Sequence, residues 1–405
     1  MANVFERLGV RTAINAVGPS TRLSGGIMPA EVADAMREAS QYCVDMAELQ
    51  ARASQIISEL TGAEAGYVTS GAAAGLLLGT AACVTGLDPV KMNRLPDTRG
   101  LRRRVIIPRS HRNFYDHAIR TVGVELVEVG IADRYSGAGV RDTEAWEIAA
   151  AIDADTAAVV YVASATSLPP LAAVVAAAHA ADVPVLVDAA AQLPPAANLR
   201  RFIELGADLV AFSGGKAIRG PQASGFLCGR RDLIAAVALQ HLDLDIYWEL
   251  WDPPASLIDR RQLPGAPHHG VGRPCKVGKE EVVGLLTALQ RFAHEDPDAR
   301  RARWVALMEA LVAASHGVAH AQLELIADPK RAEVPLVRLQ LDEQGAGFDA
   351  LELVRRLRDG TPAIHANPAQ AAAGVVLFGP ISLQLGEPEQ VGARLRQLLG
   401  AVSPS

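Results

Sequence analysis

Short apolar runs alternate with longer helical segments from residue 64 to about residue 290. The apolar runs predict buried strands, and the alanine-rich or amphipathic segments between them predict helices. Strand–helix alternation of this kind is typical of an α/β fold with a mostly parallel sheet, here seven-stranded, covered on both faces. The predicted strands are 66–69, 105–108, 125–129, 157–162, 185–188, 209–213 and 225–228. The predicted helices are 72–85, 113–122, 142–152, 171–181 and 231–241.

The first 60 residues form a separate lead-in, with one helix from about Pro29 to Ser40 and a second from about Asp45 to Thr61. Glu48 and Gln50 are polar residues inside the second helix. They indicate either a solvated face or a contact with another subunit. Further on, prolines and five basic residues interrupt the alternation between residues 87 and 104 and predict an exposed loop near the site entrance.

The pattern changes at about Asp296. A helix at 298–316, strands at 322–327 and 336–341, a helix at 349–358 and a strand pair within 374–385 predict a small α+β domain. The predicted domains are therefore N-terminal arm and helices 1–60, large domain 61–292 and small domain 293–405.

Composition narrows the class of protein. The chain has 405 residues, a net charge of −6 and a pI of about 6.0, which argue against a nucleic-acid partner. Four widely spaced cysteines match no metal-ligand spacing and predict reduced thiols. Residues 1–11 do not read as a signal peptide, and no helix is apolar enough to span a membrane. We therefore expect a cytoplasmic protein with no membrane partner.

The candidate chemistry centres on Lys216, which follows the strand 209–213 and the glycines Gly214 and Gly215. A desolvated lysine loses its proton more readily and becomes a nucleophile toward carbonyls. Taken alone, this stretch favours the alternative of an ordinary turn with a solvated lysine. Asp188, however, ends the preceding strand of the pattern, so both residues are expected at the carboxyl edge of the sheet, where α/β sheets bind ligands. A lysine that forms a Schiff base and an acid that holds a pyridinium nitrogen are what pyridoxal phosphate requires.

A third stretch supplies a place for a phosphate. Residues 67–74 predict a strand, a Ser-Gly turn and the start of an alanine-rich helix. The free N–H groups and the positive dipole end of such a helix bind phosphate. We therefore expect Ser70, Gly71 and Ala72, together with Ser213, to hold the cofactor phosphate.

These stretches resemble the fold-type-I pyridoxal-phosphate enzymes, and more narrowly the branch of selenocysteine synthase and the D-glucosaminate-6-phosphate ammonia-lyase-like proteins. The resemblance implies the fold-type-I transferase fold, Schiff-base chemistry, a homodimer or higher homo-oligomer with sites at the subunit interface, and a small-molecule amino-acid substrate. The matching stretches are 14–18, 44–50, 60–65, 68–74, 212–216, 220–222 and 272–281.

Other loops carry further candidate residues. In this fold a ring from the loop after the strand at 105–108 stacks on the cofactor, and His111 is the first choice, ahead of Tyr115 and His117. Ser164 begins a run of hydroxyls that either reaches the cofactor or substrate or forms a simple polar turn. Gln192, which follows Asp188, is also placed among the cofactor-binding residues.

Three cations, Arg273, Lys276 and Lys279, lie before and at the start of a predicted helix, against the preference of a helix dipole for acids there. An anion bound among them would relieve this conflict; the alternative is repulsion tolerated at an exposed surface. Relatives often carry an arginine after the stretch equivalent to 362–364, whereas this chain has His365. That departure leaves recognition of a substrate carboxylate at this place unassigned.

The predicted activity is α,β-elimination of ammonia from a hydroxylated amino acid, possibly a phosphorylated sugar amino acid, to give a 2-keto acid. Lys216 would act as the base at Cα, with Asp188 and His111 on the cofactor. The same residues are compatible with an amino-acid racemase or epimerase. A selenium transferase is less favoured because the protein is acidic, and a non-catalytic scaffold would be expected to lack Lys216 or Asp188.

Overall fold

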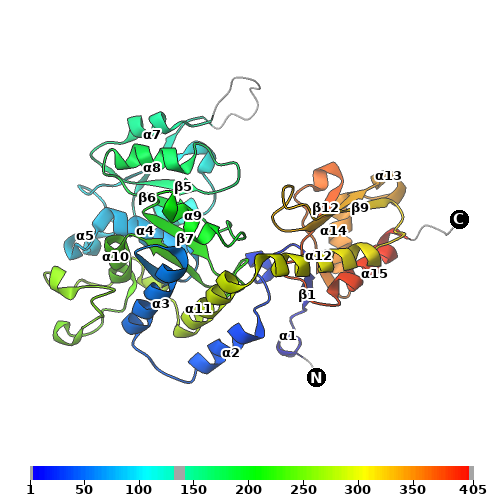
Figure 1. Cartoon of the computed structure of the whole chain (residues 1–405), viewed down its shortest axis with the longest axis horizontal. Helices are drawn as coiled ribbons and strands as arrows, with labels where there is room; N and C mark the ends of the chain where they lie inside the picture. The colour runs from blue at the N-terminus through cyan, green and yellow to red at the C-terminus, as the bar shows by residue number, and fades with distance from the viewer. Residues whose placement is uncertain (1–2, 132–141, 401–405) are drawn as a thin grey trace. The chain divides into compact units, whose positions relative to one another are not determined.

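The computed structural model describes residues 3–131 and 142–400, which fold as two compact units. One unit is residues 28–293, and the other combines residues 1–27 with residues 294–405. The lead-in that the sequence pattern set apart as 1–60 is thus divided between the two units. The first strand belongs with the C-terminal part of the chain, and the two long N-terminal helices belong with the large sheet (Figure 1).

The larger unit is built on a seven-stranded sheet with the order β2-β8-β7-β6-β5-β3-β4. Neighbouring strands are parallel except at β8, which is antiparallel to both β2 and β7. All seven predicted strands are confirmed, with small changes at their ends. The strands are β2 Ala65–Thr69, β3 Arg104–Pro108, β4 Glu125–Val129, β5 Thr156–Val162, β6 Val185–Asp188, β7 Leu209–Ser213 and β8 Gly225–Gly229.

Helices cover both faces of this sheet. The helices of the unit are α2 Ala30–Ala39, α3 Met46–Thr61, α4 Ala72–Thr85, α5 Pro89–Arg94, α6 Asp116–Arg120, α7 Ala145–Ala151, α8 Leu171–His179, α9 Asn198–Glu204, α10 Arg231–His241 and α11 Lys279–His294. Side chains of β7 alternate between two buried clusters: Val210 and Phe212 pack with α3, α8, α9 and α11, whereas Leu209 and Ala211 pack with α4, α6 and α10. This alternation explains why the central strands read as continuous apolar runs.

Helix α3 closes the β2 edge of the sheet. The side chain of Gln50, 1% exposed, donates to the Val68 carbonyl and accepts from the Val68 N–H, both at 3.0 Å. The Ser54 hydroxyl accepts from the Gly66 N–H at 3.0 Å. The sequence pattern suggested that Gln50 lies on a solvated face or at a subunit contact, but its side chain is buried against β2. It supplies the hydrogen bonds that an edge strand would otherwise leave unmade.

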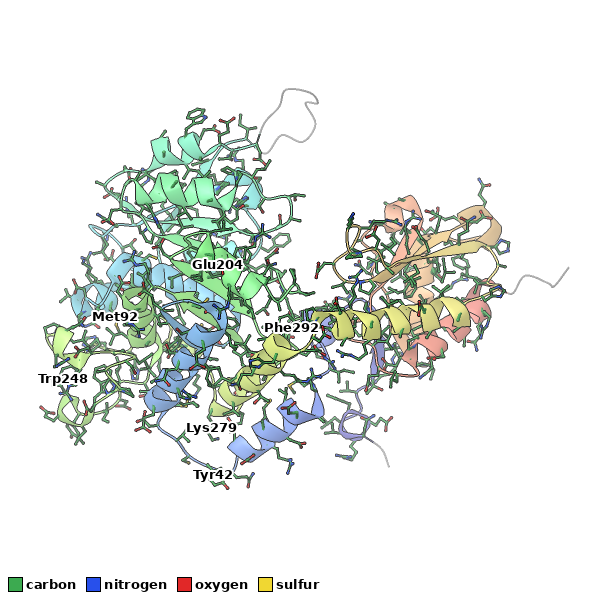
Figure 2. The ribbon with its side chains drawn as sticks, viewed as in Figure 1. Tyr42, Met92, Glu204, Trp248, Lys279 and Phe292 are labelled. Carbon is green, nitrogen blue, oxygen red and sulfur yellow. The ribbon has the colours of Figure 1, made fainter. Side chains whose placement is uncertain are left out.

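The segment from 87 to 104 is only partly the exposed loop that its composition predicts. Asp88 caps the short helix α5 by accepting hydrogen bonds from the Val90 and Lys91 N–H groups. Met92, 2% exposed, packs into the apolar cluster on the α4 side of the sheet (Figure 2). Met92 therefore anchors part of this segment to the core.

The smaller unit has the α+β composition that the sequence predicts. An antiparallel sheet, β12-β10-β9, packs its apolar face with α12 Pro297–Ala314, α14 Ala350–Asp359 and α15 Glu387–Leu399. Its strands are β9 Ala321–Ile326, β10 Leu336–Leu341 and β12 Val375–Phe378. The predicted strand pair at 374–385 is wrong, because only β12 forms there. Instead, β11 Ala363–His365 pairs in parallel with β1 Ala13–Asn15.

The structure also bears on membrane spans, disulfides and metal binding. No helix in the described ranges is long and apolar enough to cross a membrane. The four cysteines are not joined in disulfides. Among residues 3–131 and 142–400, no group of three or more histidine, cysteine, aspartate or glutamate side chains could hold a metal ion.

Candidate active site

The turn that carries Lys216 is closely packed. The Gly214 N–H donates to the Ser224 carbonyl at 2.8 Å, and the Gly220 N–H donates to the Gly214 carbonyl at 2.9 Å. A Cβ at Gly214 would lie 2.3 Å from the Ser224 hydroxyl oxygen, and one at Gly215 would lie 2.6 Å from a side-chain oxygen of Gln222. Both positions therefore exclude a side chain, which explains the glycines before Lys216.

Asp188 lies at the carboxyl end of β6, opposite Ala211 of β7 and Val162 of β5. It is 8% exposed and accepts a hydrogen bond of 3.0 Å from the Ala190 N–H. Burial raises the pKa of Asp188, and the Ala190 N–H and the charge of Lys216 oppose that rise. Burial lowers the pKa of Lys216, and the charge of Asp188 opposes that effect. Asp188 ends β6 and Lys216 follows β7, the neighbouring parallel strand, so both residues belong to the carboxyl edge of the sheet.

The N-terminus of α4 lies at the same edge. Gly71 is its N-cap residue with φ +113°, no side chain caps the helix, and its first turn has no acid. Gly225 of β8 pairs with Thr69 on one side and with Ser213 on the other. A Cβ on Gly225 would lie 2.6 Å from the Gly71 carbonyl carbon and 2.7 Å from the Ala72 nitrogen. Only glycine fits at position 225 of β8. The absence of a side chain there lets this strand lie close to Ser70, Gly71, Ala72 and Ser213.

His111 follows β3 in the short 3₁₀ turn η2 Arg109–His111 and is 5% exposed. Its Nδ1 accepts from the Val162 N–H at 3.2 Å, and its ring meets Tyr161 edge-on at 4.7 Å. Burial lowers the pKa of His111, against smaller effects of the Leu168 carbonyl and Asp142. Within the described residues, its buried Nε2 makes no hydrogen bond of normal geometry. A small cavity is lined by both His111 and Asp188.

Four other residues predicted near the cofactor are more exposed than His111: Tyr115, His117, Ser164 and Gln192. Tyr115 is 59% exposed, and His117 contacts Arg120 on the surface of α6. Ser164 is exposed, and its hydroxyl oxygen lies 2.8 Å from that of Ser167, in the polar turn that was the alternative interpretation. Gln192 is half-buried in the loop after β6, and its N–H donates to the Ala189 carbonyl. His111 is the ring that the fold buries beside Asp188.

The three cations line one cavity of about 580 Å³ together with Ser70. Arg273 belongs to the turn η5 Arg273–Cys275, Lys276 is exposed, and Lys279 is the first residue of α11 (Figure 2). The segment just before the turn packs closely against α10: a Cβ at Gly270 would lie 2.4 Å from the Gln240 carbonyl oxygen, and the Gly272 N–H donates to that oxygen at 3.2 Å. The cavity therefore joins the predicted phosphate site to the predicted anion site.

Carboxylates already balance part of this charge. Arg273 donates to one oxygen of Asp243 from Nη2 at 2.8 Å and from Nε at 3.2 Å. Lys279 pairs with Glu280, which lies with Glu281 in the first turn of α11. The argument from a conflict with the helix dipole is therefore wrong, because these acids satisfy the dipole. Lys276 has no carboxylate within ion-pair distance among the residues described.

A buried hydrogen-bond chain that sequence reasoning missed lies in the wall of this cavity. The Tyr67 hydroxyl lies 2.9 Å from Nδ1 of His241. Nε2 of His241 lies 3.0 Å from the Cys275 carbonyl oxygen, which also accepts from the Ser70 hydroxyl at 2.7 Å. Tyr67 and His241 are far apart in the sequence and lie within apolar surroundings, so no local motif marks them.

In the smaller unit, His365, at the place where the resemblance led us to expect an arginine, is paired in register with Asn15. Burial lowers the pKa of His365, and the nearby charges of Arg22, Arg358 and Arg11 lower it further.

The fold and the sheet-edge constellation together define a class. A mainly parallel seven-stranded sheet with lysine and aspartate at its carboxyl edge, accompanied by an α+β unit, is the architecture of the fold-type-I pyridoxal-phosphate enzymes. The chain belongs to the family of SelA, L-seryl-tRNA selenium transferase, whose family model matches residues 21–245. Its cofactor is pyridoxal phosphate.

Similar proteins match almost the whole chain. A 5'-C-glycyluridine monooxygenase-decarboxylase from Streptomyces sp is 32% identical, over 98% of this chain and 92% of the relative. A D-glucosaminate-6-phosphate ammonia lyase from Salmonella typhimurium is 31% identical, over 98% of both chains. The solved structure of a D-glucosaminate-6-phosphate ammonia-lyase is 29% identical, covers 98% of both chains and has a TM-score of 0.80.

Proposed function

We propose that the protein is a pyridoxal-phosphate-dependent lyase that removes ammonia from an anionic, hydroxylated amino acid. The observation that carries the proposal is the end-to-end similarity to D-glucosaminate-6-phosphate ammonia lyase, in a chain that keeps Lys216 and Asp188 at one sheet edge. D-Glucosaminate 6-phosphate is therefore the first substrate to test.

The residues at this edge fit the cofactor. The lowered pKa of Lys216 favours the neutral amine that forms a Schiff base with an aldehyde. The uncapped N-terminus of α4 offers N–H donors to the phosphate, with Ser70, Gly71, Ala72 and Ser213 around it. Asp188 would face the pyridine nitrogen, whose positive charge would counter the effect of burial on the carboxyl pKa. His111 would stack on the ring, with Ser164 and Gln192 as further contacts.

When bound, pyridoxal phosphate supplies an electron sink for negative charge that develops at the substrate Cα. Asp188 would hold the proton on the ring nitrogen and so keep that sink effective. The Nζ atom of Lys216 would take the Cα proton. The β-hydroxyl would leave as water with the proton that Nζ of Lys216 has taken, which gives an unsaturated amine. Its hydrolysis gives a 2-keto acid and ammonia. No net oxidation occurs.

The cation-lined cavity would bind the anionic end of the substrate. Lys276, which has no carboxylate partner in the described ranges, and Arg273, which is 25% exposed at its side chain, are the available donors. Lys279 keeps two of its three ammonium donors, because Glu280 accepts only one of them. Charge-assisted hydrogen bonds of this kind contribute roughly 1.5–3 kcal/mol each.

Two other reactions use the same residues. The full-length similarity to a monooxygenase-decarboxylase favours, as a second candidate, an O₂-dependent decarboxylation. Return of the Cα proton to the opposite face would make the protein a racemase.

One set of assays separates the three reactions. The full-length enzyme is incubated with D-glucosaminate 6-phosphate and a panel of hydroxy-amino acids in deuterated water, with and without O₂. The lyase predicts equal amounts of ammonia and 2-keto acid, independent of O₂. CO₂ formation that stops without O₂ would establish the decarboxylase. Inverted, Cα-deuterated amino acid without ammonia would establish a racemase.

We further propose a cytoplasmic homo-oligomer that acts on a small molecule and not on nucleic acid. The acidic net charge of −6 supports the last point. Sedimentation at the assay concentration tests the assembly, and a fully active monomer would contradict it.

A further inference from the structure

The hydrogen-bond chain behind the cavity has only one possible arrangement of protons when His241 is neutral. The Cys275 carbonyl can only accept, so Nε2 of His241 must carry the hydrogen. Nδ1 then accepts, and the Tyr67 hydroxyl donates to it. Burial lowers the pKa of His241, the Cys275 carbonyl opposes this, and the charge of Arg273 adds to it. The neutral ring is therefore the stable form. The Cys275 carbonyl selects its tautomer, and the Tyr67 hydroxyl donates to the nitrogen that is left without a hydrogen.

Ser70 joins this chain to the cofactor site. Its hydroxyl has one proton, and in the structure that proton is donated to the Cys275 carbonyl at 2.7 Å. Ser70 also immediately precedes the uncapped N-terminus of α4. If its hydroxyl donates to a phosphate there, the Cys275 carbonyl keeps only the His241 bond among the hydrogen bonds described above.

We propose that His241, oriented by Tyr67, is a positioning residue that holds the Cys275 carbonyl when Ser70 turns its hydroxyl to the cofactor phosphate. The proposal rests on the proposed function, which places that phosphate at the start of α4. Because Cys275 lies between Arg273 and Lys276, His241 keeps the cation-bearing turn in place while the cofactor binds. Cofactor binding and anion binding are thereby coupled through Ser70 and His241.

A double-mutant cycle on cofactor affinity tests this coupling. The full chain, depleted of cofactor, is titrated with pyridoxal phosphate and followed by its absorbance; thermal unfolding of the cofactor-free form serves as the folding control. His241→Leu should weaken pyridoxal-phosphate binding about ten-fold, because Ser70 can then satisfy either the carbonyl or the phosphate but not both. Ser70→Ala should also weaken binding. In the Ser70→Ala background, His241→Leu should add less than about two-fold, since no shared proton remains.

The outcomes separate the possibilities. Equal effects of His241→Leu in both backgrounds would mean a merely structural histidine and would overturn the coupling, as would unchanged affinity in His241→Leu itself. His241→Gln keeps an amide donor and should retain nearly normal affinity for pyridoxal phosphate. It replaces His241→Leu in the test if that variant does not fold. A ten-fold loss of affinity in His241→Gln would count against the proposal. If Ser70→Ala leaves affinity unchanged, the placement of the phosphate is wrong, which is a failure of the proposed function.

Discussion

Loss of Arg273 should raise KM for the anionic substrate while kcat changes little. In the structure the Arg273 side chain is 25% exposed, lines the cavity and has two donors within 3.2 Å of one Asp243 oxygen. A guanidinium has five donors, so three remain for a ligand. One charge-assisted hydrogen bond contributes roughly 1.5–3 kcal/mol, so Arg273→Ala should raise KM by about ten-fold or more.

Two comparison variants make this test specific. Arg261 also donates to an aspartate from Nε and Nη2, at 2.8 Å to each oxygen of Asp259. It does not line the cavity and serves as the control. Arg261→Ala should leave KM within about two-fold of the starting value. Asp243→Asn removes a negative charge from the cavity wall and should lower KM, opposite in direction to Arg273→Ala.

Steady-state kinetics with D-glucosaminate 6-phosphate, or with the best substrate found, measures these changes. Equal increases of KM in Arg273→Ala and Asp243→Asn would show that the ion pair only braces the turn, and would refute the reasoning. If Arg273→Ala instead loses pyridoxal phosphate while KM is unchanged, these cations bind the cofactor phosphate of a neighbouring subunit.

Three further predictions concern the sheet edge and its support. Asp188→Asn should keep the cofactor bound but lower turnover by about 100-fold or more, because the ring nitrogen loses its anionic partner; near-normal turnover would remove Asp188 from the mechanism. Covalent uptake of pyridoxal phosphate by the cofactor-free chain should rise with pH and reach half its maximum below pH 10.5, because burial lowers the pKa of Lys216 and neutral amine is the reactive form; a midpoint at or above that value would contradict the burial effect. Gln50→Leu should lower the free energy of unfolding by about 2–6 kcal/mol in urea, since the Val68 N–H and carbonyl each lose their partner. Exposed Gln55→Leu on the same helix is its control, and equal small losses in both would contradict the edge-capping role.

The sequence pattern was sufficient for the parts of the fold that local periodicity encodes. The strand 209–213 was predicted with the bounds of β7, because a buried parallel strand reads as an unbroken apolar run. The order of strand ends along the chain was enough to bring Asp188 and Lys216 to one edge. The glycines before Lys216 and at Gly225 mark places where neighbouring backbone leaves no room for a Cβ.

Features that depend on distant partners were not predictable in this way. Gln50 appeared to be on a polar helix face, but it bonds to the backbone of β2, eighteen residues away. Asp243 pairs with Arg273 across thirty residues, a contact that the local run of cations does not indicate. The pairing of β1 with β11 joins opposite ends of the chain. Such contacts depend on tertiary packing, which periodicity does not record.

Reduction of the enzyme with borohydride, followed by peptide mapping, tests the central claim most directly. The cofactor absorbance in the visible range should disappear, and a pyridoxyl group should be found on the peptide that contains Lys216. The variant Lys216→Ala should take up no covalent label. A pyridoxyl group on Lys276, Lys279 or any other lysine of the native enzyme, with Lys216 unmodified, would contradict the account.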